Sequence, residues 1–393
     1  MTTMPIQVLF VDQFGGLGGG QKVLSMLIRS LDSKRFNCVA ALNGQGEFRT
    51  QLAQSGFEVT ALPLGDYPSQ KKSIGDQAKF FLKTLLCVIH LVYYIKKKKI
   101  DVLYANGPRA FFCTTLAGLV TRLPVLWHLH SILPNGIPRH LARFFSRWTT
   151  RIIACSEATA LPLLKGNPSL TAKLMIVPNP CLFVGETMKR EEALQILGLT
   201  QLEPNRVGFG MMGRITPFKG QLQFLKAAAL VAKHRKDAYF WIFGSPARGD
   251  NNDFHYFEQL TRFRADYGLE ASVLFVPWRD DIETCYSLFD ILVLSSQGEE
   301  GLPLCTIEAL SLGKPVIARG NGGLRDLLEN EFNGLLVDEA SPEQLARKML
   351  EMLDSSPKRR QYSENARSRM ESWITPKMFG QRLEQILTET IKP

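Results

Sequence analysis

Short, uniformly apolar runs recur along the whole chain and alternate with longer amphipathic stretches. Because these runs do not alternate with polar residues, each predicts a strand covered on both faces, as in a parallel sheet. Helical patterns separate nearly all of them, so the order βαβαβ occurs twice. The predicted strands span residues 6–11, 37–42, 58–62, 101–104, 125–130, 151–154, 174–177, 206–212, 238–243, 273–276, 291–294, 315–318 and 334–337. The expected fold class is α/β, with two doubly wound domains in tandem.

The domain organisation follows from the length and from one Pro- and Gly-containing stretch. With 393 residues, the chain exceeds the roughly 250 to 300 residues at which a single core stops growing. The join is expected after the last strand of the first half, giving domains over residues 1–185 and 186–372. Residues 373–393 predict a terminal helix, for which packing back onto the first domain is one option. Ligands bind at the carboxyl ends of strands in such sheets, so two facing domains would form a cleft.

Apolar segments and cysteines indicate where the chain is expected to function. No apolar run reaches the roughly 18 residues of a membrane-spanning helix, and the N-terminus lacks the basic start of a signal peptide. The seven cysteines are odd in number, widely spaced and without a CxxC pair, which favours reduced core thiols. A cytoplasmic protein is expected.

The basic excess lies entirely in the first half of the chain. Residues 1–185 hold 21 Lys and Arg against 8 Asp and Glu, whereas the remainder holds 26 against 29. Such asymmetry suggests that the first half meets an anionic partner: a membrane surface, a phosphorylated acceptor or nucleic acid. Solubility alone is the alternative interpretation.

Two glycine-containing turns each follow a predicted strand and open a helix. In "FGGLGGGQKV" five glycines could let the backbone approach a phosphate or sugar, although the spacing is not GxGxxG and a plain tight turn stays open. The second, "GRITPFKG", starts at Gly213 and contains Arg214 and Lys219. Two cations beside a helix start suit a diphosphate, with surface solvation as the alternative.

Two acids flank a mostly apolar stretch in "GEEGLPLCTIEAL". Glu300 is expected in the loop after a buried strand, and Glu308 in the first turns of the next helix, so that each could reach one end of an elongated ligand. Favourable placement near the helix dipole is the simpler explanation. A third candidate group lies in "PVLWHLHS", where alternation sends His128 and His130 to one face. No third ligand lies nearby, so satisfied histidines are favoured over a metal pair.

The segment Phe80–Ile95 is apolar apart from a narrow polar stripe. At 1.5 Å per residue it spans about 24 Å, short of the roughly 30 Å hydrocarbon core. A helix that packs in its domain is favoured, and an interfacial helix near anionic lipid is the alternative, with Lys71, Lys72 and the run 96–99 beside headgroups. Peripheral attachment to the inner face of the cytoplasmic membrane, through the basic first domain, is the resulting hypothesis.

Taken in order, these motifs resemble those of the retaining GT-B glycosyltransferases of family 4. "EEGLPLCTIEALSLGKPVIARGNGG" looks like the family's Glu, seven residues, Glu motif, "GRITPFKG" is similar to its phosphate-binding turn, and "IIACSEA…IVPNP" to the end of its first domain. The resemblance covers essentially the whole chain. It implies two Rossmann-like domains, an acceptor-binding first and a nucleotide-sugar-binding second, and a retaining, metal-independent transfer of a hexosyl group.

The resemblance also implies roles for the candidate residues. Glu308 would hold the ribose, Glu300 the donor sugar, and His130 would lie near the reacting sugar. The further donor contacts would come from Gly18, Gly19, Gly213, Arg214, Lys219, Gly301, Leu302 and Pro303. The donor would be a UDP- or GDP-sugar, with no cofactor or metal, and the acceptor a saccharide, a lipid-linked or another hydroxyl compound. A role in polysaccharide, glycolipid or cell-envelope biosynthesis is implied.

The sequence departs from the family pattern at two places. Asp326 stands where the family often has Glu, and Pro180 stands where Gly is commoner. Glu299 also rivals Glu300, although the count of seven selects Glu300. A sugar-nucleotide epimerase or a phosphorylase of the same fold remains an alternative, opposed by the Glu pair and by "GRITPFKG". A non-catalytic anion- or nucleic-acid-binding protein is the alternative from another class. Because no RNA- or DNA-binding module appears, nucleic acid is not expected as a partner.

Overall fold

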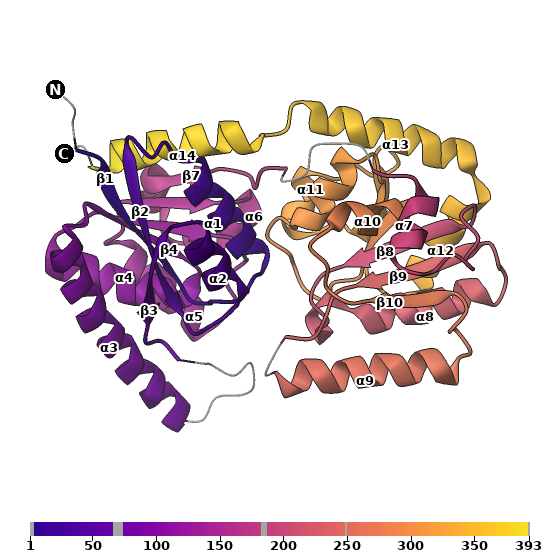
Figure 1. Ribbon diagram of the computed structural model, residues 1–393, viewed down its shortest axis with the longest axis horizontal. Helices are drawn as coiled ribbons and strands as arrows, with labels where there is room; N and C mark the ends of the chain where they lie inside the picture. The colour runs from indigo at the N-terminus through magenta and orange to yellow at the C-terminus, as the bar shows by residue number, and fades with distance from the viewer. Residues whose placement is uncertain (1–3, 66–73, 182–186, 248–249, 392–393) are drawn as a thin grey trace. The chain divides into compact units, whose positions relative to one another are not determined.

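The computed structural model describes residues 4–65, 74–181, 187–247 and 250–391 (Figure 1). The chain divides into two compact units, one of Met1–Pro180 with Ile374–Pro393 and one of Cys181–Trp373. The first boundary therefore falls five residues before the expected position. The C-terminal segment belongs to the first unit. Lys71 and Lys72 lie outside the described residues.

Each unit contains one parallel sheet. The seven-stranded sheet of the first unit has the order β3-β2-β1-β4-β5-β6-β7, and the six-stranded sheet of the second has the order β10-β9-β8-β11-β12-β13. The strands of the first sheet are β1 (Ile6–Asp12), β2 (Phe36–Asn43), β3 (Glu58–Leu62), β4 (Val102–Asn106), β5 (Val125–Leu129), β6 (Arg151–Ala154) and β7 (Leu174–Ile176). Those of the second are β8 (Val207–Met212), β9 (Ala238–Phe243), β10 (Val273–Val276), β11 (Ile291–Leu294), β12 (Val316–Arg319) and β13 (Gly334–Val337). Every strand predicted from its apolar run is present, with ends shifted by at most two residues.

Helices connect the strands and cover the sheets. In the described residues the α-helices are α1 (Gly19–Ser30), α2 (Glu47–Gln54), α3 (Ile74–Lys98), α4 (Pro108–Thr121), α5 (Ile137–Ser146), α6 (Glu157–Leu164), α7 (Arg190–Ile196), α8 (Gln221–Ala232), α9 (Asn251–Asp266), α10 (Ile282–Ser287), α11 (Leu304–Ser311), α12 (Pro342–Asp354), α13 (Ser356–Glu371) and α14 (Pro376–Ile391). Short 3-10 helices are η1 (Pro168–Lys173), η2 (Pro217–Lys219) and η3 (Gly322–Asp326). The expected α/β class with two doubly wound units is confirmed.

The core of the first unit lies between its sheet and two helical layers. Helix α3 contacts α4, which contacts α5, while α1 contacts α2 and α14. Large aromatic side chains fill the interior: the rings of Phe111 and Trp127 stack with centroids 4.5 Å apart. The indole of Trp127 donates to the Thr115 hydroxyl at 3.0 Å, so this buried polar group is satisfied. The sheet is thus covered on both faces, as its continuously apolar strands require.

Helix α3 is longer than the sequence predicted. It has 25 residues, about 37 Å at 1.5 Å per residue, instead of the 16 apolar residues recognised in the sequence. The prediction was too short because lysines and polar residues extend the helix at both ends. No helix in the described part of the chain combines the length and apolarity needed to cross a bilayer.

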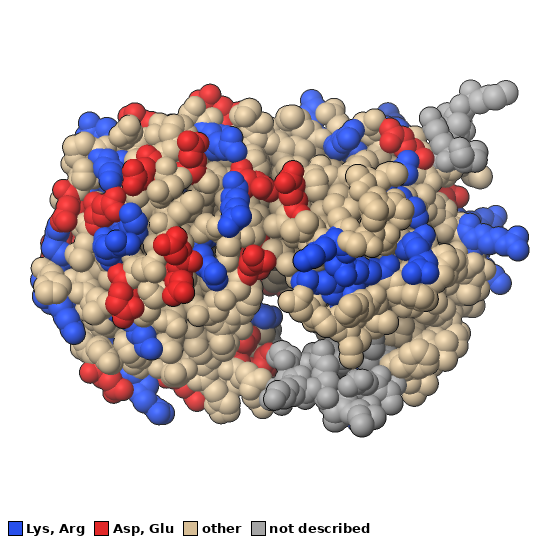
Figure 2. Space-filling view, turned by 180° about the vertical axis from the view of Figure 1, so that it is seen from behind, with Lys and Arg blue, Asp and Glu red and all other residues tan. Residues whose placement is uncertain are grey.

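Charge is distributed differently over the two units. On the face drawn in Figure 2, Lys and Arg of the first unit gather with few acidic side chains among them, whereas both signs intersperse on the second unit. On this face the folded protein keeps the asymmetry counted along the sequence.

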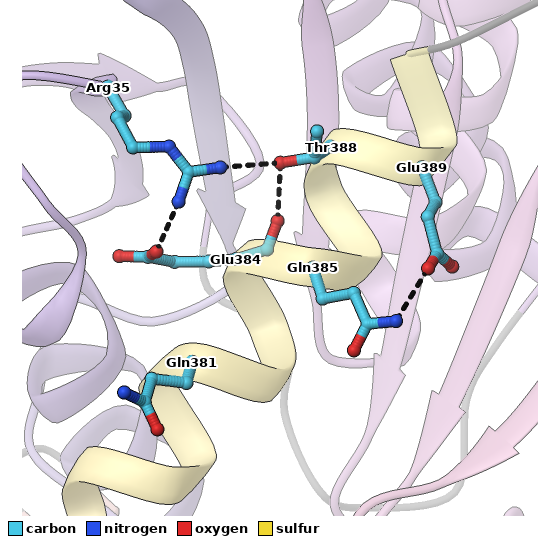
Figure 3. Close-up of a pocket in the computed structure, with 6 residues that line it drawn as sticks. All are labelled: Arg35, Gln381, Glu384, Gln385, Thr388 and Glu389. Atoms are coloured by element: carbon cyan, nitrogen blue, oxygen red, sulfur yellow. Dashed lines mark hydrogen bonds and ion pairs between the residues drawn. The ribbon is translucent and has the colours of Figure 1, made fainter.

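The C-terminal helix α14 is fastened to the first unit by polar and apolar contacts. Arg35 donates to Glu384 at 2.9 Å and to Thr388 at 3.2 Å (Figure 3). Glu384 also accepts the Asp32 backbone N–H at 2.7 Å. Phe379 is fully buried, with its ring centroid 6.3 Å from that of His128. A segment distant in sequence thus supports the end of β5.

We expect Phe379→Ala to lower the free energy of unfolding of the first unit by about 3 to 5 kcal/mol, because it leaves a cavity beneath α14. The neighbouring Met378 is half exposed, so Met378→Ala should change this free energy by at most about 0.5 kcal/mol. Urea denaturation of both variants, followed by circular dichroism, measures the difference. Equal midpoints for the two variants would contradict the buried role of Phe379.

Candidate active site

Polar side chains collect at one place in each sheet, where the strand order reverses. In the first unit this place lies between β1 and β4, and in the second between β8 and β11. In open parallel sheets the loops leaving these strands diverge at the switch point, so their carboxyl ends form a natural binding crevice. The predicted site residues lie in the loops and helices that follow these strands, except His130, which follows β5.

The turn after β8 depends on Gly220. Its φ of +75° lies in the left-handed region, and a Cβ there would come within 2.0 Å of the Ser295 carbonyl oxygen. The Ser295 hydroxyl donates back to the Gly220 carbonyl at 2.8 Å. Only glycine therefore allows the turn to approach the end of β11 this closely. Gly213, which begins the turn, also has a positive φ, of +146°.

Lys219 and Glu300 form the central ion pair of the second unit. The Lys219 ammonium donates to both carboxylate oxygens of Glu300 at 2.7 Å. Both side chains are largely buried, with 22% of Lys219 and 10% of Glu300 exposed. The Ser296 hydroxyl also donates to the Glu300 carboxylate. The pair brings together two residues that are 81 positions apart in the sequence.

The backbone around Glu300 is fixed by the glycine pair that follows β12. The Gly323 N–H donates to the Glu300 carbonyl at 2.9 Å. Gly322 has a φ of +57°, and a Cβ on it would lie 2.3 Å from the same oxygen. Glu299 is exposed and has no ion pair with the lysine. Between the two rival acids, Glu300 is therefore the one that the fold brings to the turn.

Arg214 is held more loosely than Lys219. Its guanidinium Nε lies 3.5 Å from a carboxylate oxygen of Asp253, and 60% of its side chain is exposed. Asp253 itself is buried near the start of α9. The exposed position leaves this cation able to reorient toward an anion at the end of β8.

Glu308 lies on α11 and is buried. The Tyr286 hydroxyl donates to its carboxylate at 2.8 Å. Burial, followed by the charge of Glu308, raises the pKa of Tyr286 well above its usual value, so the phenol stays protonated and remains a donor. A short buried stretch leads from Glu300 to the N-terminus of α11, the helix that carries Glu308. It consists of Gly301, Leu302 and Pro303.

In the first unit, His130 belongs to a chain of hydrogen bonds from β1. The Asn106 amide donates to Asp12, and its carbonyl oxygen contacts His130 Nε2 at 2.7 Å. Because an amide oxygen only accepts, Nε2 must carry the proton. Gln21 donates to both Asp12 oxygens at 3.0 Å, which ties the network to α1, the helix that begins at Gly19 after the cap residue Gly18.

Both histidines are neutral near pH 7. Burial lowers the pKa of His130 to about 4, while a hydrogen bond with Asn179 acts in the opposite direction. Burial, followed by the charge of His130, lowers the pKa of His128 far below its usual range. His128 is hydrogen-bonded to the Tyr104 hydroxyl at 2.6 Å. The ring centroids of His128 and His130 are 3.9 Å apart, so these two side chains share a face as alternation predicted.

Sequence reasoning missed Asp12 and Asn106. Asp12 ends β1 and Asn106 ends β4, and the two are register partners in adjacent strands. A polar residue closing each of two apolar runs was the signal available in the sequence. Burial raises the pKa of Asp12 to about 6, although hydrogen bonds from Asn106, Phe14 and Gln21 oppose this rise. Tyr286 and Ser296 were also missed, since nothing in their spacing links them to the two glutamates.

Among the described residues, no group of three or more His, Cys, Asp or Glu side chains has an arrangement suited to a metal ion. The candidate sites consist instead of side-chain cations, carboxylates and helix starts. Such groups can hold phosphates and hydroxyls.

Two family profiles match the chain in sequence order. "Glycosyltransferase Family 4" matches residues 17–181, and "Glycosyl transferases group 1" matches residues 200–369. The chain belongs to the family 4 glycosyltransferases with the GT-B fold. It is 27% identical to the Escherichia coli protein named UDP-Gal:alpha-D-GlcNAc-diphosphoundecaprenol alpha-1,3-galactosyltransferase, over 70% of this chain and 73% of the relative. It is 29% identical to spore coat protein SA of Bacillus subtilis, over 41% of this chain and 43% of the relative.

Solved structures with the same fold cover almost the whole chain. HepE from Anabaena, in complex with UDP and glucose, aligns with a TM-score of 0.79 at 23% identity over 98% of this chain and 99% of the other. A glycosyltransferase from Rickettsia africae aligns with a TM-score of 0.75 at 19% identity over 99% of each chain. At these identities the likeness establishes the fold.

The raised pKa of Asp12 predicts a pH-dependent effect of Asp12→Asn. In the wild type, the contribution of this carboxyl group to stability is present below its unfolded pKa of 3.8 and is lost as the pH rises through about 6. The variant lacks this loss. Its free energy of unfolding should therefore rise relative to the wild type by about 2 kcal/mol between pH 4 and pH 7.

Urea denaturation at several pH values measures this change. The effect of His130, which has the opposite sign, is present in both proteins and cancels to first order. Glu47→Gln, which changes an exposed carboxylate of the same unit, serves as the control and should follow the wild type. A constant difference between Asp12→Asn and wild type across this range would show that Asp12 does not titrate with a raised pKa.

Proposed function

We propose that the protein is a retaining, metal-independent glycosyltransferase. It moves a hexosyl group from a UDP- or GDP-sugar to a hydroxyl group of a saccharide or lipid-linked acceptor. Its place in metabolism is the synthesis of polysaccharide, glycolipid or cell envelope. Family membership supports the sugar transfer. Retention, metal independence, the acceptor and the pathway are proposed in addition. The cytoplasm or the inner face of its membrane remains the predicted location.

The observation that carries this proposal is the ion pair between Lys219 and Glu300 at the end of β8. A largely buried ammonium held by one carboxylate is costly to desolvate, and a donor diphosphate would give it a second anionic partner. Binding would draw Lys219 toward phosphate and leave Glu300 to accept hydrogen bonds from sugar hydroxyls. Arg214, mostly exposed beside the same turn, would supply the second cation.

The proposed chemistry needs charge stabilisation more than it needs an enzymatic base. As the bond between the anomeric carbon and the phosphate oxygen breaks, negative charge grows on the phosphate and positive charge on the sugar. Lys219 and Arg214, drawn to the diphosphate when the donor binds, would stabilise the departing phosphate. That phosphate takes the proton of the acceptor hydroxyl as the new bond forms on the same face of the sugar.

The remaining residues would hold the substrates. Glu308, kept in place by the Tyr286 hydroxyl, is proposed to accept hydrogen bonds from the ribose hydroxyls. The backbone of residues 301–303 is proposed to contact the sugar. His130, neutral with its proton on Nε2, is proposed to lie near the reacting sugar, and Gly18 and Gly19 near the diphosphate or acceptor. The acceptor is assigned to the first unit and the donor to the second.

Two relatives indicate which substrates to test first. The Escherichia coli relative carries UDP-Gal and a diphosphoundecaprenol-linked GlcNAc in its name. The Anabaena protein was crystallised with UDP and glucose. A UDP-hexose with a polyprenyl-diphosphate sugar is therefore the first donor and acceptor pair to assay.

The donor site is tested with Lys219→Ala. A panel of UDP- and GDP-sugars identifies the best donor by nucleotide release with and without acceptor. On that donor we expect kcat/KM to fall by about 100- to 1000-fold, because the departing phosphate loses a preorganised cation. Lys233→Ala, at the far end of α8 and exposed, is the matched control and should stay within about twofold. Full activity of the folded Lys219→Ala variant would disprove the assignment.

For the wild-type protein, equal rates with and without EDTA are expected, because the proposed reaction needs no metal.

Stereochemistry tests the mechanism separately from the site. With an α-linked nucleotide-sugar donor, the newly formed product should show an α anomeric proton in NMR spectra recorded early in the reaction. The departing phosphate deprotonates the acceptor on the face that the phosphate leaves, so the configuration is kept. A β product would contradict retention while leaving the sugar-transfer function intact.

A further inference from the structure

Helix α3 presents apolar side chains on two opposite faces. One face packs into the first unit, through the buried residues Cys87, Val88, Leu91, Tyr94 and Ile95. The opposite face is exposed, with Phe81, Leu82, Leu85, Leu86, Ile89 and Tyr93 each 48% to 73% accessible. A helix of an ordinary soluble domain is apolar on one stripe only. Packing within this unit therefore does not explain why this face is apolar.

Helix α5 adds a second exposed apolar face, one that the sequence interpretation did not single out. Ile137, Leu141 and Phe144 on α5, and Trp148 in the turn just after it, are 37% to 66% accessible. The rings of Phe144 and Trp148 are 4.9 Å apart, and the Arg147 guanidinium lies 4.6 Å from the Phe144 centroid. Aromatic rings beside arginine suit a boundary between an apolar phase and water.

These two faces belong to one helical layer. Helix α4 contacts both α3 and α5, so the three helices lie next to one another over the first sheet. At its C-terminal end α4 contributes Leu119 and Val120, which are 44% and 65% exposed. The apolar side chains are therefore spread over a surface formed by three adjacent helices.

The charge of this layer is one-sided. From residue 74, where α3 begins, to residue 156 the sequence contains twelve Lys and Arg but only two acids, Asp76 and Asp101. Glu58 of the neighbouring β3 also pairs with Lys98 of α3. Asp101 accepts a hydrogen bond from the Gln7 N–H at 2.7 Å, next to the start of β4. Figure 2 shows basic side chains gathered, with few acidic ones among them, on one face of the first unit. Exposed apolar groups surrounded by cations complement a surface that is apolar inside and negatively charged outside.

We propose that the outer faces of α3 and α5 together form a docking surface for a membrane with anionic headgroups. The apolar side chains enter the boundary between headgroups and acyl chains, while the lysines and arginines remain at the level of the phosphates. This docking surface deepens the proposed function. It rests on that function in one respect: docking would bring the enzyme to a lipid-linked acceptor.

The test measures binding alone, so it is independent of sugar transfer. Full-length protein is floated with vesicles of phosphatidylglycerol and phosphatidylcholine in equal parts, and with pure phosphatidylcholine. We expect strong flotation only with the anionic vesicles at about 0.05 M salt, weakened at about 0.5 M, where charges are screened. Absence of binding to anionic vesicles at low salt would overturn the proposal and leave the glycosyltransferase assignment unaffected.

Three isoleucines with similar exposure provide matched variants. Ile89 on α3 and Ile137 on α5 are 61% and 66% exposed, and Ile196 on α7 of the second unit is 52% exposed. Replacing either of the first two by Glu should weaken partitioning by about tenfold, because an inserted apolar group becomes a repelled charge. Ile196→Glu should stay within about twofold of wild type. Circular dichroism checks that all three variants fold.

The pattern across the variants decides between occupants of the surface. If Ile89→Glu weakens binding and Ile137→Glu does not, the two-helix surface is wrong. Size-exclusion chromatography with light scattering is run on the same proteins. A wild-type dimer that Ile89→Glu converts to a monomer, with flotation unchanged, would identify the face as an interface between copies and would also overturn membrane docking.

Discussion

Each unit of this protein is constrained by a parallel sheet whose two faces are both buried. Strands of this kind have no water-facing side, so their interiors must be apolar and their polar chemistry is confined to their ends. The register partners Asp12 and Asn106 illustrate this, because both close apolar strands at the point where the strand order reverses. The ion pair of Lys219 with Glu300 occupies the corresponding place in the second unit. Both candidate sites are consequences of one architectural constraint.

The two ends differ in the kind of electrostatics they use. In the first unit, burial favours neutral groups: it lowers the pKa of His130 to about 4 and raises that of Asp12 to about 6. In the second unit, opposite charges face each other directly, and the lysine is balanced by a carboxylate. Buried hydrogen-bonding groups such as His130, which is neutral at pH 7, suit an uncharged sugar, and a set of cations suits a diphosphate. This division agrees with the proposed assignment of acceptor and donor.

The third region, the layer of α3, α4 and α5, does not depend on either site. Its exposed apolar residues would be unfavourable in water without a partner, and its cations have few acids beside them. The C-terminal helix α14 contacts α1 instead, so it leaves that layer uncovered within the described residues. Catalysis and docking are thus proposed for different surfaces of the same unit, and substitutions can separate them.

The sequence by itself determined the strands and the α/β class, and it predicted most of the residues proposed for the candidate site. Apolar runs are local signals, and all the strands they predicted are present because a buried strand needs no distant partner to be recognised. The motifs around Lys219 and Glu300 were found through their resemblance to a family. Their roles in binding and catalysis remain predictions.

Only the tertiary structure decided which side chains meet. It paired Glu300, and not Glu299, with Lys219 across 81 positions, and it linked His130 to Asp12 through Asn106. It also divided α3 into a buried face and an exposed one, a distinction that an almost uniformly apolar segment does not contain. The physical reason is the same in each case: contacts between distant residues depend on how strands and helices are arranged, and local sequence patterns do not record that arrangement.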